Sequence, residues 1–255
     1  MQSMLGNRRL PDLSDLIAKY EIPTTRPPPD SLFWMMWDQV GSIAYDTLTL
    51  PFLQGIRNGT LDPNKYGGYN VADAYYCFKG ADAYEVAISH TELESPLRAF
   101  LGKKYISYKK YNDTFPDTWH VSSAAAVTPP RITKEYAAYE DSVARHLSPI
   151  YALIVMLPCE YLWAWLASEM APAKPGNVYA GWIKDNMDPS GAYAMGNFLH
   201  TYMERNRVDW RLAIKVYRKA TYYEYANFAA ATGDKVKDSS DYGLTDPDIP
   251  ESYEQ

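Results

Sequence analysis

The chain contains 255 residues, of which 47% are hydrophobic, and its formal net charge is -6 at pH 7. This composition is typical of a soluble globular protein, and the length suffices for one domain with a sizeable core. The negative charge argues against a nucleic-acid partner, because proteins that follow the phosphate backbone present clustered Lys and Arg side chains. With 23 Tyr against 7 Phe, we expect a polar pocket lined by tyrosines, since buried hydroxyls need hydrogen-bond partners.

The first thirty residues end in IPTTRPPPD, whose prolines favour extended chain. The opening MQSMLGNRRLPDLSDLIAKY lacks the apolar core of a signal peptide, and later apolar runs are shorter than the roughly 18–20 residues that span a membrane. We therefore expect residues 1–30 to be an irregular extension of a cytoplasmic protein with no membrane partner. The two cysteines, Cys77 and Cys159, are expected to be free thiols in that reducing compartment.

From Leu32 onward, apolar residues recur with helical rather than alternating spacing, which predicts a single-domain, all-α bundle over residues 31–232. The segment 105–130 is expected to be a loop or a short helix. The acidic tail, residues 233–255, is expected to be mobile unless it packs on a neighbour. The predicted helices cover residues 31–46, 49–58, 63–89, 92–105, 131–146, 148–171, 177–187, 190–205 and 208–232.

One face of the predicted helix 208–232 carries an acid among apolar and aromatic residues. Spacings of four and three place on that face Trp210, Ile214, Tyr217, Thr221, Glu224 and Phe228. A carboxylate buried there without a partner would acquire a raised pKa or destabilise the fold. Glu224 is therefore expected to be either the partner of a core arginine or a functional acid.

Three other predicted helices also point polar or reactive side chains at the core. A buried cysteine or tyrosine taken alone is most often a packing residue. Four helices that each contribute such a group, however, are what a pocket inside a helical bundle requires. The inward groups are Asp73 and Tyr76 on helix 63–89, Tyr136 and Tyr139 on helix 131–146, and Cys159 and Trp163 on helix 148–171.

Pro158 stands directly before Cys159 in the apolar stretch IYALIVMLPCEYLWAWL. A proline inside a helix costs about 3 kcal/mol, because it removes a backbone hydrogen bond and clashes with the preceding turn. We expect Pro158 to kink the helix, so that the thiol of Cys159 faces a cavity.

Four segments contain recognisable motifs: LPFLQGIRNGTLDPNKYGGYNVADAYYC, MLPCEYLW, NVYAGWI and ATYYEYANF. In this order, from about Leu50 to Phe228, they resemble the motifs of the TenA family, known as thiaminase II or aminopyrimidine aminohydrolase. The resemblance implies a haem-oxygenase-like helical fold and a thiamin-salvage hydrolase acting on thiamin or its degraded pyrimidine. It also implies a homo-oligomer, tetramer or dimer, and no metal or organic cofactor.

The resemblance assigns the chemistry to two residues. Cys159 is implied to be the nucleophile that adds to the pyrimidine ring, which lets the substituent on the exocyclic methylene leave. Glu224 is implied to protonate the leaving amine and later to deprotonate water. General chemistry agrees, since covalent catalysis needs a thiolate and a nearby carboxylate can move its proton.

The resemblance also implies how the substrate is held. Asp73 is expected to anchor the amino group and a ring nitrogen of the pyrimidine. Tyr76 and Tyr136 are expected to line the ring and orient the thiol, and Tyr139 and Trp163 complete the predicted lining.

Several positions depart from the family pattern. Ala72 stands where the family commonly has Gln, Trp163 where it has Tyr, and Asn186 about where a Tyr follows the Trp-Ile pair. Asn227 interrupts the usual Phe-Trp after the closing Glu. These changes leave open whether the substrate is thiamin, the aminopyrimidine or another pyrimidine-like molecule.

Two other functions are compatible with a fold of this class. A diiron oxidase needs several inward His and carboxylate ligands. The chain has four histidines, and His200 and Glu204 lie four residues apart on one predicted helix, a spacing that also fits a surface pair. A non-catalytic protein that binds a pyrimidine-like ligand is the second alternative, although a binder has no evident need for both a thiol and a carboxylate.

Overall fold

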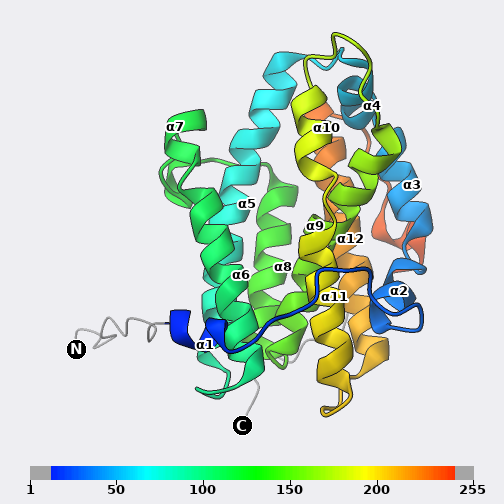
Figure 1. Cartoon of the computed structure of the whole chain (residues 1–255). Coiled ribbons are helices and arrows are strands. Elements are labelled where there is room, and N and C mark those ends of the chain that lie inside the picture. The colour runs from blue at the N-terminus through cyan, green and yellow to red at the C-terminus, as the bar shows by residue number, and fades with distance from the viewer. Residues whose placement is uncertain (1–12, 245–255) are drawn as a thin grey trace.

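A computed structural model describes residues 13–244, and within that range every regular element is a helix. Helices from distant parts of the sequence stand side by side in an elongated bundle (Figure 1). The α-helices are α1 (Ser14–Ala18), α2 (Leu32–Trp37), α3 (Gly41–Thr49), α4 (Pro51–Asn58), α5 (Pro63–Ser89), α6 (Pro96–Asn112), α7 (Phe115–Trp119), α8 (Arg131–His146), α9 (Ile150–Met170), α10 (Ala180–Asn186), α11 (Ser190–Met203) and α12 (Trp210–Thr232). Two short 3-10 helices cover Ala124–Ala126 and Ser239–Tyr242.

Side-chain caps fix where two of the long helices begin. The Asp62 carboxylate accepts a hydrogen bond from a first-turn backbone N–H of α5 at 2.8 Å, and Pro63 takes the first helical position. Asp209 accepts from two first-turn N–H groups of α12 in the same way. α12 ends at Gly233, whose φ of 77° is left-handed and suits glycine.

The apolar helix α9 forms the centre of the bundle. It packs against α8, α10, α11 and α12, and α5 packs in turn against α6 and α8. By length and composition α9 could cross a membrane, but 78% of its most apolar window is buried inside the protein. It is therefore the core helix of the domain, and it continues through Pro158 as one element.

Two predicted helices differ from the structure. The helix predicted over 31–46 is divided into α2 and α3, because the chain turns at 38–40 and Val40 leaves helical geometry with φ -119° and ψ 9°. The helix predicted over 92–105 begins at Pro96 after the cap Ser95 and continues to Asn112. Part of the doubtful segment 105–130 is therefore the end of α6, and α7 follows it.

Both extensions pack on the bundle where the structure describes them. The N-terminal extension is irregular apart from the five-residue α1, and Asn197 of α11 donates to the Pro23 carbonyl. In the tail, Lys237 and Tyr242 both bind Asp46 of α3 at 2.8 and 2.7 Å. The tail therefore packs on the body of the protein up to residue 244. Residues 1–12 and 245–255 lie outside the described part of the chain.

Candidate functional site

Glu224 lies on the buried face of α12, as its spacing predicts, and only 2% of its surface is exposed. The Tyr136 hydroxyl donates to Glu224 Oε1 and the Trp163 indole N–H donates to Oε2, both at 3.0 Å. These partners are neutral, so the carboxylate is bound by hydrogen bonds rather than by a core arginine. Burial raises the pKa of Glu224 to about 7, against the opposing effect of the two hydrogen bonds. The group can therefore gain or lose a proton near neutral pH.

Cys159 lies on α9, one residue after Pro158, and its side chain is partly buried. Its sulfur lies 3.0 Å from the Tyr108 hydroxyl, and its thiol donates to the Met156 carbonyl at 3.1 Å. Burial, followed by the charge of Glu224, raises the pKa of the thiol well above its usual range. The resting cysteine is therefore protonated, and nucleophilic attack by Cys159 requires a base.

Asp73 lines a cavity of about 240 Å³ at the surface end of the site. Burial raises the pKa of its carboxyl to about 7, and the Cys77 thiol, 3.8 Å away, opposes this rise. Tyr69, Ala72 and Asn227 line the same cavity. Two of the positions that depart from the family pattern therefore shape the opening that leads to Asp73.

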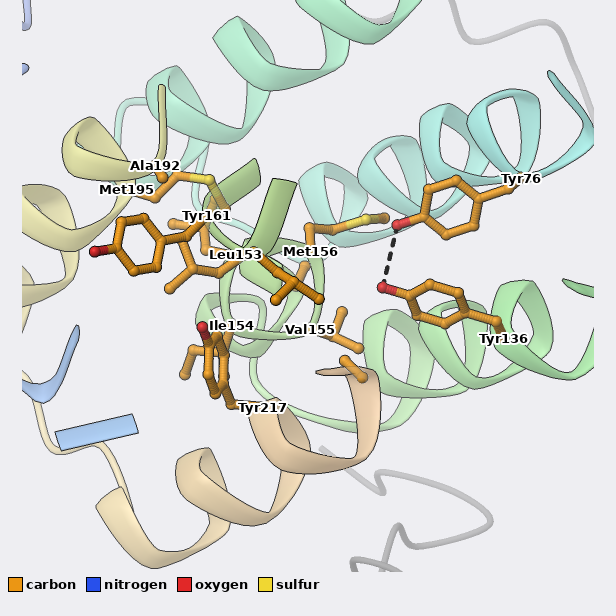
Figure 2. Packing of buried hydrophobic residues seen from close by; sticks show 14 of the residues in the cluster. Tyr76, Tyr136, Leu153, Ile154, Val155, Met156, Tyr161, Ala192, Met195 and Tyr217 are labelled. Carbon is orange, nitrogen blue, oxygen red and sulfur yellow. Dashed lines mark hydrogen bonds between the residues drawn. The ribbon is translucent and has the colours of Figure 1, made fainter. Parts of the chain in front are cut away.

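Tyr76 and Tyr136 form the centre of the site. Their rings stack with centroids 4.7 Å apart, and their hydroxyl oxygens lie 3.4 Å apart and point toward one another (Figure 2). The Tyr76 hydroxyl also donates to Glu140 Oε1 at 2.6 Å. Glu140 is fully buried on α8. It was not predicted as a site residue from the sequence, although it follows Tyr136 by four residues and so shares its face.

An aromatic wall runs from Tyr69, which lines the cavity, to Trp163, which binds Glu224. Tyr69 stacks on Phe228 with centroids 5.0 Å apart, and Trp163 lies 5.4 Å from Phe228 and 5.5 Å from Trp182. Trp163 therefore has two contacts with the site, because its ring extends this wall while its N–H binds the acid.

Two inward positions predicted from spacing differ from the structure. Tyr139 is partly buried, donates to the Val216 carbonyl at 3.4 Å, and packs against the ring of Tyr223, which stacks on the site residue Tyr136. Trp210, at the start of α12, is 43% exposed. The inward face of α12 begins farther along the helix.

The pair His200 and Glu204, considered as metal ligands, lies on and just after the end of α11. His200 is partly buried and Glu204 is exposed. Within residues 13–244, no three His, Cys, Asp or Glu side chains are grouped so that they could hold a metal ion.

At the level of sequence, no protein-family model matches the chain, and no curated protein matches it significantly. Solved structures do match. The TenA homologue from P. horikoshii OT3 is 18% identical with a TM-score of 0.68, and the match covers 79% of this chain and 98% of that protein. A TenA family transcription regulator from Silicibacter sp. TM1040 is 14% identical with a TM-score of 0.71, covering 81% of this chain and 98% of that one.

A third match is a protein from Sulfolobus solfataricus P2 that is provisionally named a TenA-like thiaminase. It is 14% identical with a TM-score of 0.60, and the match covers 80% of this chain and 97% of that one. At such identities the likeness concerns the fold, and the fold implied by the sequence resemblance is confirmed. The chain has the all-helical, haem-oxygenase-like fold of the TenA proteins.

Proposed function

We propose that the protein is a hydrolase of the thiaminase II type, which acts on thiamin or on its degraded aminopyrimidine through a covalent cysteine intermediate. The observation that carries the proposal is the buried Glu224, held by two neutral donors, with a pKa of about 7 and within electrostatic reach of Cys159. A general acid and base works best when its pKa lies near the working pH. The fold of the TenA proteins and the name of the Sulfolobus match support the same reaction class.

In the first step, Glu224 takes the thiol proton as Cys159 sulfur bonds to a pyrimidine ring carbon. The electron pair of the ring double bond moves to a ring nitrogen, where Asp73 is proposed to hold the pyrimidine. The bond between the exocyclic methylene and its substituent then breaks, and Glu224 returns the proton to the leaving amine when the substrate is the aminopyrimidine. The thiazole of thiamin leaves as a neutral ring without a proton, so with this substrate Glu224 releases the thiol proton to solvent before the second step.

In the second step, water adds to the exocyclic methylene and gives up a proton to Glu224. The carbon–sulfur bond breaks, and the proton returns to the departing Cys159 sulfur. The enzyme is regenerated with the hydroxymethylpyrimidine as product. Because Tyr136 donates to one oxygen of Glu224 and Trp163 to the other, the carboxyl group keeps its orientation through both proton transfers.

The proposed reaction is tested by measuring the hydrolysis of thiamin and of the aminomethylpyrimidine by the wild type and by Glu224→Gln. Glutamine keeps the size of the side chain but cannot transfer a proton, so kcat should fall roughly 10²–10⁴-fold with little change in KM. The melting temperature is measured on the same preparations. A variant that is destabilised but turns over normally per folded molecule would show that Glu224 is structural, and a wild type inactive on both pyrimidines would refute the reaction class.

A further inference from the structure

Glu140 is a second buried acid in the site, and its two oxygens have different surroundings. Oε1 accepts a hydrogen bond from the Tyr76 hydroxyl at 2.6 Å. Oε2 is buried and has no hydrogen-bond partner among the described residues. Buried polar atoms almost always have partners, so this exception needs an explanation.

The hydroxyl groups of Tyr76 and Tyr136 connect Glu140 to Glu224. The three successive contacts are 2.6 Å from Glu140 to Tyr76, 3.4 Å from Tyr76 to Tyr136, and 3.0 Å from Tyr136 to Glu224. The two tyrosines supply one proton each. If both acids were ionised, each tyrosine would donate to its own carboxylate, and the middle contact would join two oxygens with no proton between them. One further proton on either acid completes all three hydrogen bonds.

The surroundings of the two acids decide which one holds that proton. Both oxygens of Glu224 accept hydrogen bonds, so Glu224 can stay ionised. An ionised Glu140 would bury a charged oxygen without a partner, which costs far more than burying the carbonyl oxygen of a neutral acid. Burial also raises the pKa of Glu140 well above its usual range, and the charge of Glu224 raises it further.

Groups on the neighbouring helices also favour a protonated Glu140 beside an ionised Glu224. The other titratable groups that interact with the two acids are Tyr69, Asp73, Cys77 and Tyr84 of α5, Tyr108 of α6, Cys159 of α9 and Tyr217 of α12, and Glu160 of α9 interacts with Cys159. Every one of them is neutral or negative, and Glu160 is paired with Lys104. Among the described residues, no Lys, Arg or His contributes to the shifted pKa of either acid. A second negative charge in this interior is therefore disfavoured from all sides.

We propose that Glu140 is a positioning residue that stores a proton and shares it with Glu224 through the hydroxyl groups of Tyr76 and Tyr136. Transfer moves the Glu140 proton to Tyr76, the Tyr76 proton to Tyr136 and the Tyr136 proton to Glu224, so three O–H bonds break and three form. One proton reaches Glu224, and the negative charge moves to Glu140. The catalytic use of this proton rests on the proposed function of Glu224, whereas the shared proton itself does not.

Infrared spectroscopy of the substrate-free protein tests the proposal, because a protonated carboxyl group has its own C=O stretching band. The spectra are recorded at about pH 8.5, above the pKa of about 7 of both Asp73 and Glu224. The wild type should show a protonated-carboxyl band that is lost in Glu140→Gln. Glu135→Gln, on the same helix but on its exposed side, is the matched control and should keep the band.

Coupling between the acids is tested by titrating this band. In Glu224→Gln the band should disappear at lower pH than in the wild type, because the negative charge that disfavours ionisation of Glu140 is gone. A band that survives Glu140→Gln would overturn the stored proton, and an unchanged titration in Glu224→Gln would overturn the sharing. If the wild type gives the expected spectra but hydrolyses neither pyrimidine, the shared proton is supported and the proposed function is refuted.

Discussion

The site contains two pairs of a thiol and a carboxyl group, and the pairs differ in their partners. On α5, the Cys77 thiol donates directly to the Asp73 carboxylate, 3.8 Å away. On α9 and α12, Cys159 and Glu224 each have separate partners: Tyr108 and the Met156 carbonyl for the thiol, and two donors for the acid. The same two functional groups are thus held in two different ways.

The difference indicates different roles for the two pairs. Asp73 lines the cavity that opens toward solvent, where a ligand can reach it, and its neighbour Cys77 is buried. Glu224 is almost fully buried, and hydrogen bonds to both of its oxygens fix its orientation. The α5 pair is therefore suited to binding, and the second pair is suited to moving a proton between sulfur, substrate and water.

Replacing each cysteine in turn is the strongest way to break this comparison. Cys159→Ser should reduce hydrolysis of either pyrimidine by roughly 10³-fold or more, because a serine hydroxyl is a far weaker nucleophile at neutral pH. Circular dichroism and the melting temperature should change little. Cys77→Ser is the matched control and should retain most of the activity. Loss of activity in Cys77→Ser with Cys159→Ser unaffected would reverse the assignment of the two pairs.

The sequence predicts the long helices well, because their signals are local. Helix 63–89 coincides with α5, where an aspartate cap and a proline mark the start, and helix 131–146 coincides with α8. The turn at 38–40, which divides the predicted helix 31–46, was not predicted. Because α2 and α3 are both apolar, the helical pattern continues across this turn. Propensity and spacing therefore locate helices better than they locate short turns between them.

The site was predicted less completely, since periodicity alone does not reveal which helix faces which. Tyr139 and Glu140 lie three and four residues after Tyr136, and either spacing fits one face of a helix. Aromatic character favours the tyrosine as the inward residue, whereas the structure buries the glutamate. Tyr108 was missed because it lies in the doubtful segment 105–130, and its contact with Cys159 exists only because α6 extends that far.

Asp73→Asn sharpens the comparison from the binding side. We expect KM for the hydrolysed pyrimidine to rise roughly 10–100-fold, because a hydrogen bond to a charged group contributes about 1.5–3 kcal/mol. The amide also presents a donor where the substrate presents donors, which adds a mismatch. Steady-state kinetics at saturating substrate should show a much smaller change in kcat. A normal KM together with a reduced kcat would place Asp73 in the chemistry and remove the distinction between the pairs.

Tyr108→Phe tests the separate partner of the Cys159 thiol. Loss of one neutral hydrogen bond is worth about 0.5–1.5 kcal/mol, so kcat/KM should fall about two- to tenfold. The rate of alkylation of Cys159 by a small thiol reagent should fall as well, because the hydroxyl no longer stabilises the developing thiolate. Tyr105→Phe, one turn earlier on α6 and half-buried, is the control and should leave both rates unchanged.

The smallest expected effect is on stability, and both pairs contribute to it. Burial raises the pKa of Asp73 from 3.8 to about 7 and that of Glu224 from 4.5 to about 7. Between those values the folded protein binds more protons than the unfolded chain, so the free energy of unfolding falls as the pH rises toward 7. Above about pH 7 these two groups contribute no further change, and the fall continues only through Glu140, whose pKa burial raises well above its usual range. Asp46 acts in the opposite sense, because burial raises its pKa but Lys237 and Tyr242 together lower it by more, and that contribution is complete below this interval.

The melting temperature should therefore fall by several degrees between about pH 5 and pH 8, since 1 kcal/mol corresponds to roughly 2–4 °C in a protein of this size. Asp73→Asn and Glu224→Gln should each flatten part of this slope, because each removes one group that binds a proton only in the folded state. Asp82→Asn, on an exposed side of α5, should leave the slope unchanged. Differential scanning calorimetry of the four proteins measures the slopes. A slope that only Glu224→Gln flattens would mean that Asp73 is ionised throughout this range and that solvent in the cavity, rather than burial, sets its charge.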